Sequence, residues 1–213
     1  MDLGAYFVWF FHYMPVGASS PASLMPTPEQ RERMYHFVRD MRSKKELFTM
    51  DFQNDGEFVG GCIAGGRRYL HINAAGDVEP CVFIHYSNVN IHDVTLLEAL
   101  KSPLFMKYYE NQPFNDNHLR PCPMLENPYE LGRLVAESGA HGTDLVEPET
   151  PEDLRRKTVA GAAAWAPVAE KIWNDENDPM YTKRLEGMQQ GMAETDLEKF
   201  ERLGHFGDCQ NEK

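Results

Sequence analysis

The chain has 213 residues, and its 33 acidic side chains against 21 Lys and Arg side chains give a formal net charge of −12. This balance argues against nucleic-acid or anionic-membrane binding as the main activity, because both partners attract a cationic surface. The hydrophobic fraction of 42% is sufficient for a folded core, so the composition excludes global disorder. The four cysteines are too few for a disulfide-stapled secreted fold.

The segment 5–11 is the most apolar stretch of the chain, but its seven residues are far short of the roughly 20 that a transmembrane helix needs. No basic residue precedes Arg31, so we do not expect a signal peptide. We therefore predict a cytoplasmic protein with no membrane partner. In a reducing cytoplasm, cysteines are thiols, catalysts or metal ligands rather than bridges.

Residues 5–13 form an aromatic, β-rich run, which is typical of a parallel strand that is buried on both faces. Thr27 and Gln30 then form a capping box with proline at the first helical position, and this pattern predicts a helix. Residues 47–52 indicate a second strand. The order strand, helix, strand predicts the last piece of a βα-repeat fold whose earlier repeats are missing.

A glycine-rich segment at residues 60–66 predicts a flexible loop, and two strands at residues 67–73 and 78–84 then predict a hairpin that turns at Gly76. Capping residues predict three short helices beyond the hairpin, which begin after Thr95, at Ser102-Pro103 and at Asn127-Pro128, the last ending at Gly139.

Thr150 and the residues after it form a strong helix start near the beginning of an acidic tail. Residues 143–213 contain 16 acids and 9 bases, so they carry −7 of the net charge of −12. We predict one or two helices that pack on the body of the protein with an acidic outer face.

Cys62 and Cys81 flank the predicted hairpin, and Cys122 follows in an Arg-Pro-Cys-Pro sequence. A hairpin and a returning loop can bring three thiolates to one iron–sulfur cluster or one zinc ion. A zinc site needs a fourth ligand, for which His85 is the candidate, but paired Cys-x2-Cys knuckles are absent and iron–sulfur is favoured. From spacing alone, the three cysteines also fit buried, unliganded thiols. Cys209 is interpreted as an incidental thiol.

Other polar residues allow functional and structural interpretations. His12 follows the first strand, where barrel enzymes place site residues, and His71 could be a ligand, a hydrogen-bond donor or a structural side chain. Arg67 and Arg68 could neutralise a charged cluster or form a solvated pair. No Ser-His-Asp arrangement can be argued from the spacing.

The pattern Cys62-x13-Gly76-x4-Cys81, with a short helix at residues 96–102, resembles the C-terminal auxiliary-cluster domain of radical SAM enzymes. That domain is called SPASM in its long form and twitch in its short form. Residues 13–17 and the helix start at residues 27–30 resemble the last segment of the partial βα-barrel in the same enzymes. The resemblance covers roughly residues 5–125.

The resemblance implies an α/β (α+β) fragment in three parts. Residues 1–58 would be the end of a partial radical SAM barrel, residues 59–126 a cluster-binding β-hairpin module, and residues 127–213 a helical acidic extension. It also implies an auxiliary 4Fe-4S cluster of the twitch type, because only three candidate ligands are present: Cys62, Cys81 and Cys122.

The Cys-x3-Cys-x2-Cys motif that holds the SAM-cleaving cluster in radical SAM enzymes does not occur in this sequence. The resemblance therefore implies a missing N-terminal radical SAM core, on the same or a separate chain, which would carry S-adenosyl-L-methionine and a second 4Fe-4S cluster. This chain alone is not expected to be catalytic, although the whole would be an oxidoreductase or maturase of unknown substrate. There are two alternatives: a structural zinc module with an acidic protein-interaction tail, and a metal-free helical interaction domain.

Overall fold

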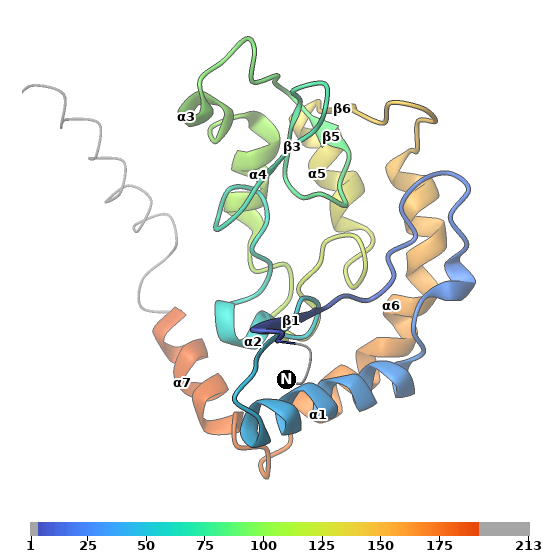
Figure 1. Ribbon diagram of the computed structural model, residues 1–213. Helices are drawn as coiled ribbons and strands as arrows, with labels where there is room; N and C mark the ends of the chain where they lie inside the picture. Colours follow the sequence, from blue (N-terminus) through green and yellow to red (C-terminus); the bar gives the residue numbers. More distant parts are fainter. Residues whose placement is uncertain (1–3, 192–213) are drawn as a thin grey trace, which may run out of the picture. The chain divides into compact units, whose positions relative to one another are not determined.

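The structure is a computed structural model that describes residues 4–191, with the side chains of residues 187–191 excluded; Cys209 lies outside this range. The chain divides into two compact units between Trp173 and Asn174. Helices and short strands occur together, which confirms a mixed α and β fold (Figure 1).

The described strands are short and pair two by two. They are β1 (Phe7–Phe10), β2 (Phe48–Asp51), β3 (His71–Ile72), β4 (Val78–Glu79), β5 (Tyr86–Ser87) and β6 (His141–Gly142). The described helices are α1 (Pro28–Lys44), α2 (Gly56–Val59), α3 (Leu96–Ala99), α4 (Pro103–Asn111), α5 (Glu130–Ser138), α6 (Pro151–Trp173) and α7 (Tyr181–Gly191), with a 3-10 turn at Ala22–Leu24.

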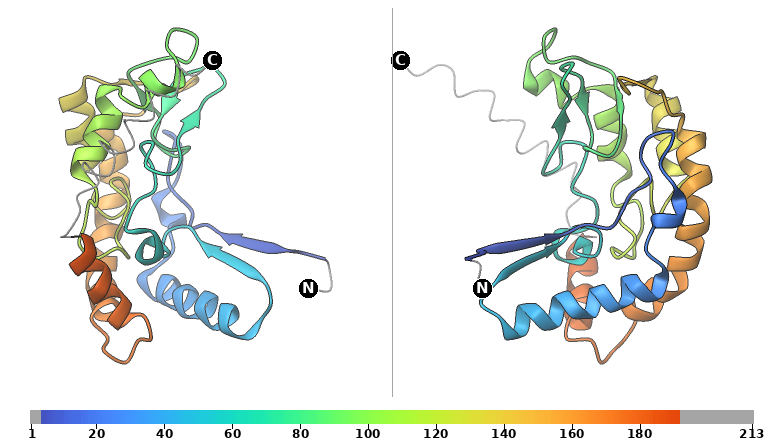
Figure 2. Two further views of the ribbon diagram at one scale, coloured as in Figure 1. Left: turned by 90° about the vertical axis from the view of Figure 1, so that its left-hand side faces the viewer. Right: turned by 45° about the vertical axis from the view of Figure 1, so that its right-hand side comes forward.

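The predicted strand–helix–strand unit is present at the N-terminal end of the first compact unit. Both hydrogen bonds of the capping box between Thr27 and Gln30 form at the start of α1. β1 and β2 pair in parallel, from Phe7 opposite Phe48 to Phe10 opposite Asp51, and α1 packs against β2 (Figure 2).

The expectation that the first strand is buried on both faces is wrong for β1. The side chains of Phe7 and Trp9 are 58% and 46% exposed. Within residues 4–191, the face of β1 that carries these two side chains is not covered by other elements, and β1 has only β2 as a neighbouring strand. The aromatic run has the composition of an interior strand but lies at an open edge.

The predicted hairpin is present as β3 and β4, with antiparallel pairs His71–Glu79 and Ile72–Val78 and a turn in which Gly76 has φ +91°. Both strands are shorter than predicted because the flanking backbone bonds elsewhere. The Gly65 amide donates to Pro80 and the Gly66 amide to Tyr69, so the loop folds back on the hairpin. β5 and β6 form a further antiparallel pair, which the sequence did not indicate.

The predicted helix starts and stops are confirmed. Thr95 and Glu98 form a capping box at α3, proline begins α4, and Gly139 ends α5 with φ +65°. α6 begins at Pro151, next to the predicted Thr150 start, and packs against α1 and α5, so this part of the tail does lie on the body. α7 belongs to the second unit.

The first compact unit has three groups of buried apolar side chains. The largest surrounds the predicted cysteine ligands and includes Ile84, Leu104 and Tyr108. The second joins α1 to α6 through Tyr35 and Trp165. Among residues 4–191, no helix combines the length and the apolar character needed to cross a membrane.

Candidate functional site

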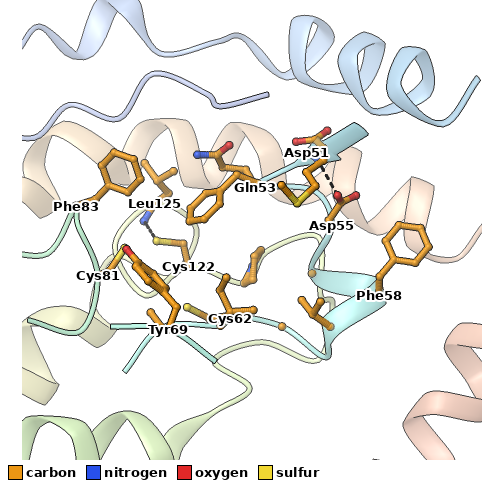
Figure 3. A pocket seen from close by; sticks show the side chains of 18 of the residues that line it. Asp51, Gln53, Asp55, Phe58, Cys62, Tyr69, Cys81, Phe83, Cys122 and Leu125 are labelled. Atoms are coloured by element: carbon orange, nitrogen blue, oxygen red, sulfur yellow. Dashed lines mark hydrogen bonds between the residues drawn. The ribbon is translucent and has the colours of Figure 1, made fainter. Parts of the chain in front are cut away.

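The structure brings the three predicted ligands to one cavity of about 610 Å³. Cys62 reaches it from the glycine loop, Cys81 from the segment after β4, and Cys122 from the loop between α4 and α5. Figure 3 shows these three side chains near one end of the cavity, with Asp51 and Asp55 toward the other. The cavity lining is largely apolar and includes Phe52, Phe83, Ile84, Tyr108 and Leu125.

The sulfur of Cys122 accepts backbone N–H groups from its own loop. The first donor is Met124, two positions further on. For Cys122 the N···S distance is 3.4 Å, and the Leu125 amide donates at the same distance. Amide donors at sulfur stabilise a thiolate and are among the features that tune bound metal centres.

Burial of the three thiols opposes their ionisation. It raises the pKa of Cys62 to about 12 and also raises the pKa values of Cys81 and Cys122. The neighbouring sulfur charges add to the effect: Cys81 raises the pKa of Cys62, and Cys62 raises the pKa of Cys122. All three are free thiols rather than disulfide partners. A bound metal would reverse this balance, because coordination deprotonates a thiol.

Two tyrosines lie beside the sulfurs. The Tyr69 hydroxyl donates to Sγ of Cys81 at 3.1 Å and accepts the Val82 amide at 2.6 Å, and Figure 3 shows its ring next to Cys81. Tyr108 is fully buried, lines the same cavity, and its hydroxyl has no hydrogen-bond partner among the described residues. The sequence contained no local signal for either role, because each contact joins distant segments.

The backbone around Cys122 is fixed by buried polar groups. Glu126 Oε2 accepts the Cys122 amide at 2.8 Å, and Asn127 Nδ2 donates to the Cys122 carbonyl at 3.1 Å. Glu126 is also ion-paired with Arg31 of α1, with 2.7 Å between Nη1 and Oε1. The proline-framed cysteine is therefore anchored to α1 rather than held by its prolines alone.

Arg67 is not half of a solvated pair. Its guanidinium donates to the carbonyl oxygens of Cys62 at 2.9 Å and Val59 at 2.7 Å, so it holds the glycine loop in place. Its charge also lowers the pKa of the Cys62 thiol, against the larger effect of burial. Arg68 is exposed.

The candidate histidines lie outside the cysteine cavity. His71 and His85 both direct Nδ1 at the buried carboxylate of Glu79, at 2.8 Å and 3.4 Å, and His85 lines a separate cavity with Thr143. The prediction of His85 as a fourth zinc ligand therefore has no support from its position. His12 follows β1 as expected; it is buried, and its Nε2 has no partner among the described atoms.

Within residues 4–191, no group of three or more His, Cys, Asp or Glu side chains is arranged to hold a single metal ion. No protein-family profile, curated protein or solved structure was found to match the chain.

Proposed function

We propose that this chain is the auxiliary-cluster part of a radical SAM protein and holds a 4Fe-4S cluster through Cys62, Cys81 and Cys122. One observation carries the proposal: three cysteines from distant segments line a single, largely apolar cavity, in which amides reach the sulfur of Cys122 and the Tyr69 hydroxyl reaches that of Cys81.

The donor set fits a cluster better than a single ion. Soft thiolates accept zinc or iron–sulfur centres, but a zinc ion draws its ligands to Zn–S bonds of about 2.3 Å and requires four of them. The described side chains form no such converging group. A cube-shaped cluster binds each cysteine at a different iron, so its ligands can line a space rather than meet at one point.

The exposed β1–β2 pair supports the further proposal of a separate radical SAM core. Parallel strands occur in sheets that are covered on both faces, and a two-stranded sheet is marginal alone. The large exposed apolar side chains on and beside these strands are Tyr6, Phe7, Trp9, Phe11 and Phe48. Addition of further parallel strands beside β1 would complete the sheet and cover part of this surface.

When bound, the cluster would anchor a substrate or pass an electron to or from it. The residues of this chain would position the cluster and shield it from water. Tyr69 and the loop amides would fix and polarise the sulfurs, and the apolar lining, with Phe52, Phe83 and Leu125, would keep water from the centre and from reactive intermediates.

Anaerobic reconstitution with iron and sulfide, followed by metal analysis, tests the cluster. We expect a brown protein with about four iron and four sulfide per chain. The separate substitutions Cys62→Ser, Cys81→Ser and Cys122→Ser should reduce bound iron, whereas the matched control Cys209→Ser should retain it.

Two outcomes would contradict the proposal. Stoichiometric zinc in place of iron would identify the structural zinc module, and a folded protein that takes up no metal would identify the metal-free interaction domain. The proposed core has its own test: a Cys-x3-Cys-x2-Cys motif should be encoded before Met1 or in an adjacent reading frame. Its absence from both would contradict a missing core.

A further inference from the structure

The side chain of Tyr108 combines complete burial with an unsatisfied hydroxyl. Tyr108 lies on α4 with no exposed surface, and its hydroxyl oxygen has no hydrogen-bond partner in the described part of the chain. A buried hydroxyl without a partner destabilises the folded state, so native proteins nearly always supply one. Because Tyr108 lines the cysteine cavity, a group bound there is the available partner.

The ring of Tyr108 is held in place by close packing. A Cβ atom on Gly65 would lie 2.5 Å to 2.6 Å from the Cβ, Cδ1 and Cγ atoms of Tyr108, so only glycine allows the loop to approach this closely. On the other side, the ring of Phe114 meets that of Tyr108 edge-on, with 5.4 Å between centroids. The hydroxyl therefore has little room to turn toward another acceptor.

The surroundings of the hydroxyl identify the kind of acceptor. After burial, the largest influences that raise the pKa of Tyr108 are the charges of Cys62, Cys122 and Cys81, in that order. The hydroxyl is therefore within electrostatic reach of all three sulfurs. Neutral thiols are weak acceptors, whereas sulfur in a metal-bound, anionic form accepts hydrogen bonds much better.

We propose that the Tyr108 hydroxyl donates a hydrogen bond to a sulfur of the bound cluster, either a cysteine ligand or an inorganic sulfide, and thereby raises the cluster's reduction potential. The inference rests on the proposed function, since it requires a cluster in this cavity. Reduction adds negative charge to the sulfurs, so a donor directed at them stabilises the reduced form more than the oxidised form. Tyr108 is thus a positioning and tuning residue and not a catalytic one.

The test compares Tyr108→Phe with Tyr86→Phe in the full chain after reconstitution with iron and sulfide. Tyr86 is a matched control, because it is also a buried tyrosine but its hydroxyl donates to the Glu149 carbonyl and it does not line the cysteine cavity. The midpoint potential is measured by redox titration with mediators. The electron paramagnetic resonance signal of the reduced cluster reports the extent of reduction at each potential.

Tyr108→Phe should bind iron as the parent does, with a more negative midpoint potential and altered g-values, while Tyr86→Phe leaves both unchanged. The metal-free Tyr108→Phe protein should unfold at the same temperature as the parent or higher, because the variant loses an unsatisfied hydroxyl. An unchanged potential and spectrum in Tyr108→Phe would overturn the inference and leave the proposed cluster in place. If the parent itself binds no iron, both the inference and the proposed function fail.

Discussion

Arg31 of α1 and Glu126 of the cysteine-bearing loop form a buried ion pair, with side chains that are 8% and 1% exposed. The same guanidinium donates to Asn54 Oδ1 at 3.0 Å and stacks over the Trp165 ring of α6 at 4.2 Å. Glu126 in turn holds the Cys122 amide. One arginine therefore connects the strand–helix–strand unit, α6 and a proposed ligand loop.

Removal of this arginine should destabilise the protein strongly. Arg31→Met leaves the buried Glu126 carboxylate without its counter-ion, and we expect the free energy of unfolding to fall by about 3–5 kcal/mol in chemical denaturation. Arg33→Met, at an exposed position of the same helix, should change it by less than about 0.5 kcal/mol. The double variant Arg31→Met/Glu126→Leu should recover much of the loss; equal stability of Arg31→Met and the parent would contradict the role assigned to the pair.

The glycine loop should tolerate no side chain at Gly65. Gly65 has φ +68°, and an added Cβ would overlap the Tyr108 ring, so Gly65→Ala should lower the free energy of unfolding by about 2–4 kcal/mol. Gly132 is the control: it lies inside α5, and its added Cβ would be 3.7 Å from the nearest neighbour, an ordinary contact. Gly132→Ala should raise stability by about 0.5–1 kcal/mol. Equal effects at the two sites would refute the packing argument.

The stability of the protein should fall with acidity because of His12. Burial, and then the charge of Arg31, lower the pKa of His12 from 6.5 to about 3. The unfolded chain then binds a proton that the folded chain does not, so stability is lost as pH falls from about 6.5 toward 3, by at most roughly 5 kcal/mol. Denaturation at a series of pH values should show a shallower decline in His12→Gln over this window. An identical decline in both proteins would exclude His12 as a source.

The metal-free thiols should react slowly with alkylating reagents. A rise in the pKa of Cys62 from 9 to about 12 lowers its thiolate fraction at pH 8 about a thousandfold, and the pKa values of Cys81 and Cys122 are also raised. In a Cys209→Ser background, iodoacetamide labelling followed by mass spectrometry should be far slower for the folded protein than for the same protein in guanidinium. If Cys62 in the folded protein is labelled as fast as Cys62 in the denatured protein, the result would contradict the burial of its sulfur.

Local signals in the sequence predicted the helices well. The capping boxes at Thr27 and Thr95 and the stop at Gly139 each depend on residues within one turn of the helix end, so they can be identified without knowledge of the fold. The gathering of the three cysteines was also predicted, from a hairpin and a returning loop, and the structure places them at one cavity. What they bind stays a prediction.

Most other contacts between distant segments could not be predicted from the sequence. The loop at residues 60–66 was predicted to be flexible. In the structure its glycines pack closely against other elements, with Gly65 against Tyr108 and Gly66 against Leu100. In the same way, the buried position of Arg31 depends on partners 23 and 88 residues away at Asn54 and Leu119. A lone arginine in a helical pattern gives no sign of such a role.

The open side of β1 has a practical consequence for the isolated chain. In the described part of the chain, β1 has no strand on its second side, and such an edge beside exposed aromatic rings is a template for any compatible strand. In a concentrated solution of one protein, the nearest such strand belongs to another copy. Self-association should therefore increase with concentration and should weaken when a lysine replaces Trp9. The surface that we propose to meet a radical SAM core is also the surface from which aggregation of this chain would begin.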